Sequence, residues 1–143
     1  MALIQIDYPE KTLFTYEIPV RITDLNYGNH LGHDTLVSLL HESRARFFEA
    51  NKMKEADING CGIILVDLGV SYRRQVFYGQ VLRIEIAAGE SSSRGCELVY
   101  RITDRGSGKL VALAQTGLLF FDYQKNRVVK MPESFAVAIG KEV

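Results

Sequence analysis

The chain has 143 residues, of which 47% are hydrophobic and 24% charged, and its 17 basic and 17 acidic side chains leave no net charge. This length and composition predict one globular domain over residues 1–143. The charge balance argues against nucleic-acid binding, which needs a clustered basic excess. The sequence lacks both an apolar run of the roughly 20 residues that span a bilayer and the basic and apolar regions of a signal peptide. We therefore expect a cytoplasmic protein with neither nucleic acid nor membrane as a partner.

Hydrophobic periodicity divides the chain into a strand, a long helix and a series of strands. Alternation predicts a strand over residues 14–22, with one face formed by Phe14, Tyr16, Ile18, Val20 and Ile22. Helical spacing over residues 35–50 predicts a mostly covered helix. Period-two patterns predict further strands at residues 62–72, 81–89, 96–103 and 110–123, with a hairpin turn at residues 106–109. A brief helix over Phe135 and Val137 is expected within residues 131–143.

This order of elements predicts an α+β domain, in which a five-stranded antiparallel sheet curls round one long central helix. One helix covers only one face of the sheet, so the other face and the edges need cover from elsewhere. That requirement favours a homo-oligomer, and the strand over residues 62–72 is the segment that we expect to pair across a two-fold axis.

Polar residues are densest in residues 24–34, Asp-Leu-Asn-Tyr-Gly-Asn-His-Leu-Gly-His-Asp, between the first strand and the helix. Such side chains are costly to place beside a core unless they hydrogen-bond one another or act on a ligand. The helix start adds unpaired N–H groups and a positive dipole end, which suit a carbonyl that becomes an oxyanion. We expect the chemistry here, with backbone N–H groups of Gly32, His33 and Asp34 as the ligand-binding donors.

Three side chains in this loop are catalytic candidates. Asp24 is a general base or a brace for His30, or else a carboxylate that caps the loop. Asn26 orients a water molecule or a carbonyl oxygen, or else closes a turn by bonding its own backbone. His30 positions a substrate or transfers a proton, since its ordinary pKa is about 6.5, or else it is structural.

Further candidates lie on the helix and the second strand. Asp34 can activate water beside the oxyanion donors, or serve only as an acidic residue at the helix start. Glu42 follows eight residues later and so shares a helix face with Asp34, but it can instead pair with Arg46 or Arg44. Asp67 interrupts an apolar strand, where it either reaches a partner subunit's site or faces solvent.

Other residues are candidates for contact with phosphate groups or a metal ion. Arg73, Arg74 and Lys109 suit contact with phosphate groups, although surface solubility explains them equally well. A metal site is not expected, because the His30-x-x-His33-Asp34 spacing is not that of a helical histidine pair and a third soft ligand is missing. Cys61 and Cys96 lack zinc-type spacing and are expected to be reduced structural thiols.

Five stretches occur in an order that matches a known family. They are Val20-Arg21, Asp24-Leu25-Asn26, His30-Leu31, Glu42-Ser43-Arg44 and residues 72–80, Tyr-Arg-Arg-Gln-Val-Phe-Tyr-Gly-Gln. Over roughly residues 12–123 the chain resembles the hotdog fold, and more narrowly the 4-hydroxybenzoyl-CoA thioesterase family of acyl-CoA and acyl-carrier-protein thioesterases.

The resemblance implies hydrolysis of an acyl-CoA or acyl-carrier-protein thioester, with no cofactor besides the CoA of the substrate. The site would lie at a subunit interface, beside the start of the central helix, in a homodimer or a dimer of dimers. In many members the second carboxylate of an Asp-x-Asp motif attacks the thioester or activates water. Here that position is Asn26, which is neutral and can be neither nucleophile nor base. The base would then be Asp34 or Glu42.

Two other functions stay open from the sequence. One is a hotdog dimer that binds an acyl thioester without cleaving it, as the missing second carboxylate would explain. The other is a thioester dehydratase or hydratase, because such enzymes pair a histidine with a carboxylate and His30 is present.

Overall fold

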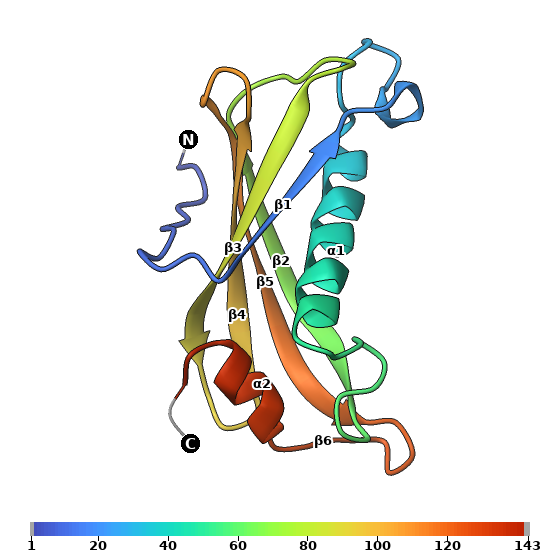
Figure 1. The fold of residues 1–143 in the computed structure, drawn as a ribbon, viewed down its shortest axis with the longest axis vertical. Helices are drawn as coiled ribbons and strands as arrows, with labels where there is room; N and C mark the ends of the chain where they lie inside the picture. The colour runs from blue at the N-terminus through green and yellow to red at the C-terminus, as the bar shows by residue number, and fades with distance from the viewer. Residues whose placement is uncertain (1, 142–143) are drawn as a thin grey trace.

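One antiparallel sheet and one long helix dominate the computed structural model, which describes residues 2–141 (Figure 1). The main strands are β1 (Phe14–Pro19), β2 (Gly62–Tyr72), β3 (Val81–Ser91), β4 (Gly95–Asp104) and β5 (Leu110–Asp122). Their order across the sheet is β1-β3-β4-β5-β2, and a short β6 (Arg127–Val128) pairs with β5. The predicted α+β hotdog architecture is confirmed, because the sheet curls round a single central helix.

Helix α1 (His33–Ala50) packs against one face of the sheet. Its apolar side chains repeat at helical spacing, so the face toward the sheet is buried: Leu36, Leu39, Leu40, Phe47 and Phe48. Ala50, the last residue of the helix, is exposed. The unexpected buried residue is Arg44, whose Nε donates to Glu55 at 3.0 Å and whose Nη1 donates to the Tyr100 hydroxyl at 3.4 Å.

The first strand is shorter than the predicted 14–22, because β1 ends at Pro19. The chain then makes one 3-10 turn, η1 (Ile22–Asp24), whose first residue is 65% exposed rather than on the apolar face. The turn is closed by a backbone hydrogen bond from Asp24 N to Arg21 O at 3.0 Å. Residues 24–34 therefore start from a fixed turn rather than from the end of a strand.

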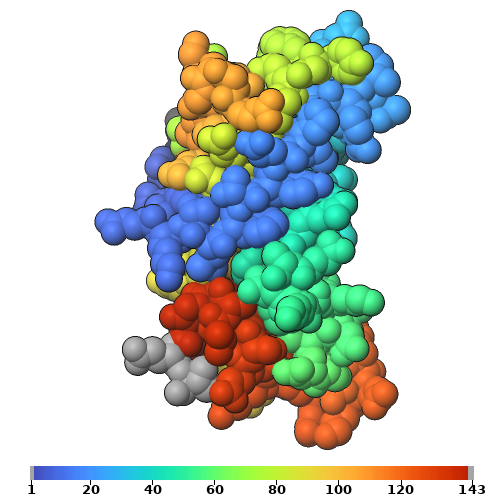
Figure 2. Space-filling view, in the orientation of Figure 1, coloured from blue at the N-terminus to red at the C-terminus, as the bar shows by residue number. Residues whose placement is uncertain are grey.

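Segments at the two ends of the chain cover further parts of the sheet. The N-terminal segment lies on the face opposite α1, where Ile6 is buried and the Ile4 and Ile6 side chains approach Gly69 (Figures 1 and 2). A short helix α2 (Glu133–Ala138) inserts Phe135 against Phe120 at 4.8 Å between ring centroids. The expected helix thus forms, but Val137 is exposed, and residues 142–143 of the expected range lie outside the described residues.

No helix in the described part of the chain combines the length and the apolar character needed to cross a bilayer.

Candidate active site

The loop from β1 to α1 is anchored by Asp24. Its side chain is buried and accepts the Arg21 backbone N–H at 2.9 Å, together with Arg21 Nη2 at 2.9 Å and Nε at 3.2 Å. These hydrogen bonds hold the pKa of the Asp24 carboxyl below its ordinary value. The Asp24 carbonyl also accepts the Gly32 N–H at 3.2 Å, so one residue ties both ends of the loop. These are the contacts of a loop-capping carboxylate, and none within residues 2–141 joins Asp24 to His30.

Asn26 and His30 are brought together by a tight turn. Asn26 N donates to His30 O at 2.9 Å, and Asn26 Oδ1 accepts the Gly28 N–H at 2.9 Å. Asn29 takes the left-handed conformation at φ 61°, which asparagine tolerates better than most residues. At Gly28 a β-carbon would lie 3.2 Å from the His30 ring and 3.3 Å from Asn26 Oδ1. Glycine therefore lets the amide and the imidazole approach each other.

One of the expected ligand-binding donors at the start of α1, the Gly32 N–H, is already occupied by the Asp24 carbonyl. Gly32 is the N-cap in extended conformation, and no side chain caps the helix. The first N–H groups of a helix have no intrahelical partner, so those of the first turn carry partial positive charge toward the loop. The Asp34 carboxylate folds back over Gly32, because a β-carbon there would lie 2.7 Å from Asp34 Oδ1 and 3.7 Å from Asn26 Cβ. Asp34 and Asn26 thus both lie beside Gly32, together with Thr35, whose Oγ1 would be 3.3 Å from the same β-carbon.

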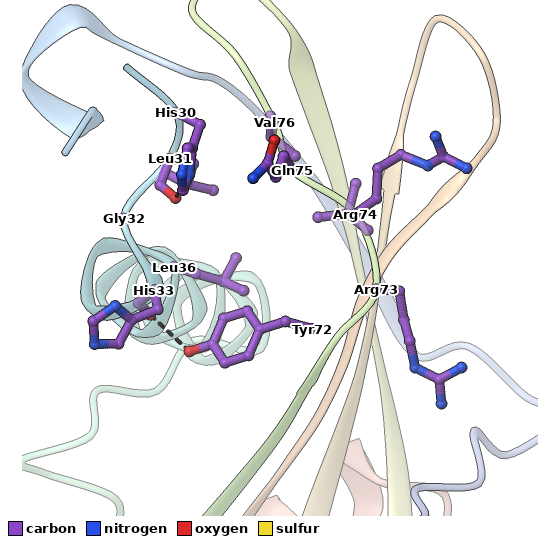
Figure 3. Close-up of a pocket in the computed structure, with 11 residues that line it drawn as sticks. His30, Leu31, Gly32, His33, Leu36, Tyr72, Arg73, Arg74, Gln75 and Val76 are labelled. Carbon is purple, nitrogen blue, oxygen red and sulfur yellow. Dashed lines mark hydrogen bonds between the residues drawn. The ribbon is translucent and has the colours of Figure 1, made fainter. Parts of the chain in front are cut away.

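Beside this point lies a cavity of about 350 Å³, between the start of α1 and the segment that follows β2 (Figure 3). Leu31 N donates to Val76 O at 2.8 Å, and the Tyr72 hydroxyl donates to His33 O at 2.8 Å, so two hydrogen bonds join the walls. The lining consists of His30, Leu31, Gly32, His33, Leu36, Tyr72, Arg73, Arg74, Gln75, Val76 and Val111. Apolar and neutral groups thus form most of the wall, and Asp34 lies next to it.

The remaining acidic candidates lie elsewhere. Glu42 accepts a hydrogen bond from Arg46 Nε at 2.7 Å on the surface of α1 and does not line the cavity. Asp67 sits at a β-bulge of β2, with its carboxylate against Gly117. It lines a shallow hollow together with Glu90 and Glu97, apart from the start of α1.

The basic candidates lie at the edge of the cavity. Arg73 and Arg74 belong to its lining, but their side chains extend to the far side of the segment after β2, away from α1 (Figure 3). Arg73 Nε donates to Ser71 Oγ at 2.9 Å. Lys109 is exposed in the turn between β4 and β5 and does not line the cavity. Any contact that these side chains made with phosphate groups would therefore lie outside the cavity.

Tyr72 was not singled out from the sequence as a site residue, although it lines the cavity. A simple alternation along β2 places positions 63, 65, 67, 69 and 71 on one face. The bulge between Leu65 and Asp67 adds one residue, so Tyr72 reaches the face that carries α1. A carboxylate in the middle of an apolar strand was the one visible sign of this irregularity.

No group of three or more His, Cys, Asp or Glu side chains in the described ranges is placed to hold a metal ion.

Comparisons with known proteins identify the family. The sequence profile of the thioesterase-like superfamily matches residues 20–139. Among proteins of curated function, none matches the sequence. Because the profile spans most of the chain, this protein belongs to the thioesterase-like superfamily.

Solved structures agree on the fold. A 1,4-dihydroxy-2-naphthoyl-CoA thioesterase from Synechocystis has a TM-score of 0.83 at 19% identity, covering 89% of this chain and 95% of its own. A Staphylococcus aureus protein solved in complex with CoA has a TM-score of 0.82 at 14% identity, covering 95% and 86%. A gentisyl-coenzyme A thioesterase has a TM-score of 0.78 at 13% identity, covering 88% and 99%.

Proposed function

We propose that this protein is an acyl-CoA thioesterase, which hydrolyses its substrate to a free acid and CoA at the start of α1. The observation that carries the proposal is the meeting of Asn26, Asp34 and an uncapped helix start beside a mostly apolar cavity. Membership of the thioesterase-like superfamily supports the reaction class, and the CoA-bound and CoA-thioester-cleaving structural relatives support CoA as the thiol.

The helix start polarises the thioester carbonyl in this proposal. The carbonyl oxygen accepts from backbone N–H groups in the first turn, His33 and Asp34 among them, while the acyl group fills the cavity. Negative charge develops on that oxygen when the carbonyl carbon becomes tetrahedral, and fixed N–H dipoles stabilise it without reorganising. Asn26 adds a further donor, because Nδ2 makes no hydrogen bond within the described residues while Oδ1 is held by Gly28.

Asp34 is the proposed general base. A water molecule attacks the carbonyl carbon and gives a proton to the Asp34 carboxylate, so the C–O bond forms as that proton leaves. The tetrahedral intermediate then breaks its C–S bond, and the CoA thiolate leaves and takes up the proton that Asp34 received, which restores the carboxylate. Asp34 fits this task better than Glu42, since Asp34 faces Gly32 and Asn26 whereas Glu42 is paired with Arg46 away from the cavity. The protein's own residues supply every group, so no cofactor beyond the substrate's CoA is needed.

The CoA moiety would extend from the cavity over the segment after β2. Arg73 and Arg74 lie there with exposed guanidinium groups, which suit bidentate contact with phosphate oxygens. The proposed phosphate contacts thus lie on one side of this short segment, and the cavity for the acyl group lies on the other.

A homodimer is proposed to complete the assembly. Within the described residues no strand pairs with the outer edge of β2, and Leu65, Val66 and Leu68 on this strand are each about half exposed. An apolar strand edge of this kind is a template for a second copy, which would join two sheets across a two-fold axis. Sedimentation velocity should give twice the chain mass, and a Val66→Lys variant should give the monomer mass.

A thiol-release screen tests the proposed reaction. Purified protein is mixed with short, long and aromatic acyl-CoAs, and CoA is followed spectroscopically. Turnover is expected with at least one of them, and Asp34→Asn should lower kcat by roughly 100-fold or more, because general-base catalysis is worth about that much. Glu42→Gln is the matched control and should stay within about threefold. Binding without turnover by the wild-type protein would favour the non-catalytic alternative, and loss of water from a 3-hydroxyacyl-CoA would favour the dehydratase.

A further inference from the structure

One charged side chain in the interior has hydrogen-bond donors that no other group of the described residues accepts. Arg44 of α1 is buried, with 4% of its side chain exposed. Its Nε donates to Glu55 and its Nη1 donates to the Tyr100 hydroxyl, but no hydrogen bond within residues 2–141 uses Nη2. A guanidinium group has five N–H donors, so three of the five lack an acceptor there.

The free donors of Arg44 reach solvent through a groove of about 160 Å³ between α1 and β2. Every fully buried side-chain nitrogen or oxygen of the described residues has a hydrogen-bond partner, so Nη2, which has none, is not sealed in the core. Arg44 lines the groove, which is therefore the opening that Nη2 reaches. The groove shares no lining residue with the cavity at the start of α1, so the two are separate sites.

The groove combines polar donors with aliphatic walls. Its lining consists of Arg44 with three other polar residues, Ser38, His41 and Thr116, and of four aliphatic ones, Val37, Leu40, Leu65 and Leu68. The Tyr100 hydroxyl bonds both Arg44 and Thr116, at 3.4 Å and 2.9 Å, so these two polar groups are held in place from behind. A guanidinium donor beside aliphatic walls suits a carboxylate that carries a short hydrocarbon tail.

Glu55 is the one carboxylate that contacts Arg44 within the described residues, and it does not occupy the groove. Its Oε1 accepts from Arg44 Nε at 3.0 Å, and its Oε2 lies 3.4 Å from His41 Nε2. This acid is thus shared between a guanidinium and an imidazole group, and it is not part of the groove lining. Nη2 stays available for a second acceptor, because the donors of a guanidinium group point in several directions from one plane.

We infer that this groove binds a free short-chain monocarboxylate, whose carboxylate accepts from Arg44 Nη2 while its tail contacts Leu65 and Leu68. These leucines also belong to the strand edge at which we propose the second copy of the chain. A homodimer formed there would take the groove out of water, and the free donors of Arg44 would then cost free energy unless an acceptor were enclosed with them. The ligand supplies that acceptor at the subunit boundary.

Titration of the nitrogen-15-labelled full-length protein with propionate tests binding and its location together. The side-chain N–H signals of Arg44 and the backbone signals of residues 37–44 should shift saturably, and those of residues 30–34, beside the cavity, should shift less. Affinity should rise about fourfold from acetate to propionate, because one more methylene leaves water. Propionamide has the same shape without the charge, so it should bind roughly tenfold more weakly than propionate.

Two variants test the donor and the groove separately. Arg44→Met removes the guanidinium group and should abolish saturable binding of propionate. Ser38→Glu places a carboxylate at an exposed position of the groove, where it repels the ligand, and should lower affinity roughly tenfold. Ser93→Glu is the matched control, because it adds the same charge at an exposed serine between β3 and β4, and its affinity should stay within about twofold of wild type. Circular dichroism verifies that each variant is folded.

Several results would overturn the carboxylate site. One is the lack of saturable shifts in the wild-type protein, which would mean that water or the second copy satisfies Arg44. Others are shifts confined to residues 30–34, equal affinity for propionate and propionamide, or unchanged affinity in Ser38→Glu. If Arg44→Met does not fold, Ser38→Glu decides, since its substitution lies at the surface. The thiol-release screen measures the proposed reaction independently of all these results.

Discussion

The Arg21 guanidinium contacts both carboxylate oxygens of Asp24, at 2.9 Å to Oδ1 and 3.2 Å to Oδ2. Arg21 is mostly exposed and Asp24 is buried, so the pair anchors a surface loop to the interior. The backbone carbonyl of the same aspartate accepts the Gly32 N–H at the helix start. The protein's own contacts therefore hold the turn that brings Asn26 and His30 together.

Loss of the Asp24 charge should weaken this anchor. Asp24→Asn keeps one acceptor oxygen but loses the charge-assisted bonds, and it should lower the free energy of unfolding by about 1–2 kcal/mol. Urea denaturation followed by circular dichroism measures the difference. The exposed Asp7→Asn is the control and should change stability by less than about 0.5 kcal/mol. Equal midpoints for both variants would contradict the anchoring role.

The same pair should make stability depend on pH. Because the pKa of Asp24 is lower in the folded state than in the unfolded chain, where it is about 3.9, its contribution is present above that value. It is lost as the pH falls through the folded-state pKa. The stability difference between wild type and Asp24→Asn should therefore be constant above about pH 5 and shrink below about pH 4. A difference that persists unchanged in acid would show that the charge is not what Arg21 recognises.

A second buried polar network should be sensitive to a single oxygen atom. Tyr100 is fully buried, its hydroxyl bonds Thr116 Oγ1 at 2.9 Å, and it accepts from Arg44 Nη1 at 3.4 Å. Tyr100→Phe leaves Arg44 and Thr116 without this partner and should cost about 1–3 kcal/mol in thermal or urea unfolding. The more exposed Tyr123→Phe should cost less, although it also loses one hydrogen bond. A larger loss for Tyr123→Phe would contradict this ranking.

The central helix, the strand series and the polar loop were predictable because each depends on local periodicity or local composition. The end of β1 at Pro19 was not, because the turn that follows is closed by the Arg21–Asp24 pair, a side-chain contact with no periodic signature. The N-terminal segment that packs on the face of the sheet opposite α1 was also not predicted. Ile4 and Ile6 are too few to form a pattern, and only the fold brings them against Gly69.

The residues that the loop contributes to the site were predictable, but the residue that β2 contributes was not. Asn26, His30, Gly32 and Asp34 are close in sequence, so their proximity follows from one turn. Tyr72 reaches the same place from a distant strand. Its face is set by a bulge of one residue, which reverses the alternation after Leu65 and leaves only a weak trace in the sequence.

Both cysteines should be poor nucleophiles in the native protein. Burial raises the pKa of Cys96 to about 12, and burial with nearby carboxylates raises that of Cys61. At pH 8 a disulfide reagent should label Cys96 only after unfolding, and Cys61 more slowly than a free thiol. Mass spectrometry of labelled peptides measures both, and rapid native labelling of Cys96 would contradict its burial. This inertness also leaves thiol-release assays with little background from the protein.

The carbonyl stretching frequency of a bound substrate analogue tests most directly whether the start of α1 activates the thioester. An acyl-CoA analogue with methylene in place of sulfur and carbon-13 at the carbonyl can be followed by isotope-edited infrared spectroscopy, free and bound. Donation from the first-turn N–H groups and Asn26 should move the carbonyl band to lower frequency on binding, and Asn26→Ala should reverse part of the shift. A bound carbonyl band at or above its frequency in water would contradict the account.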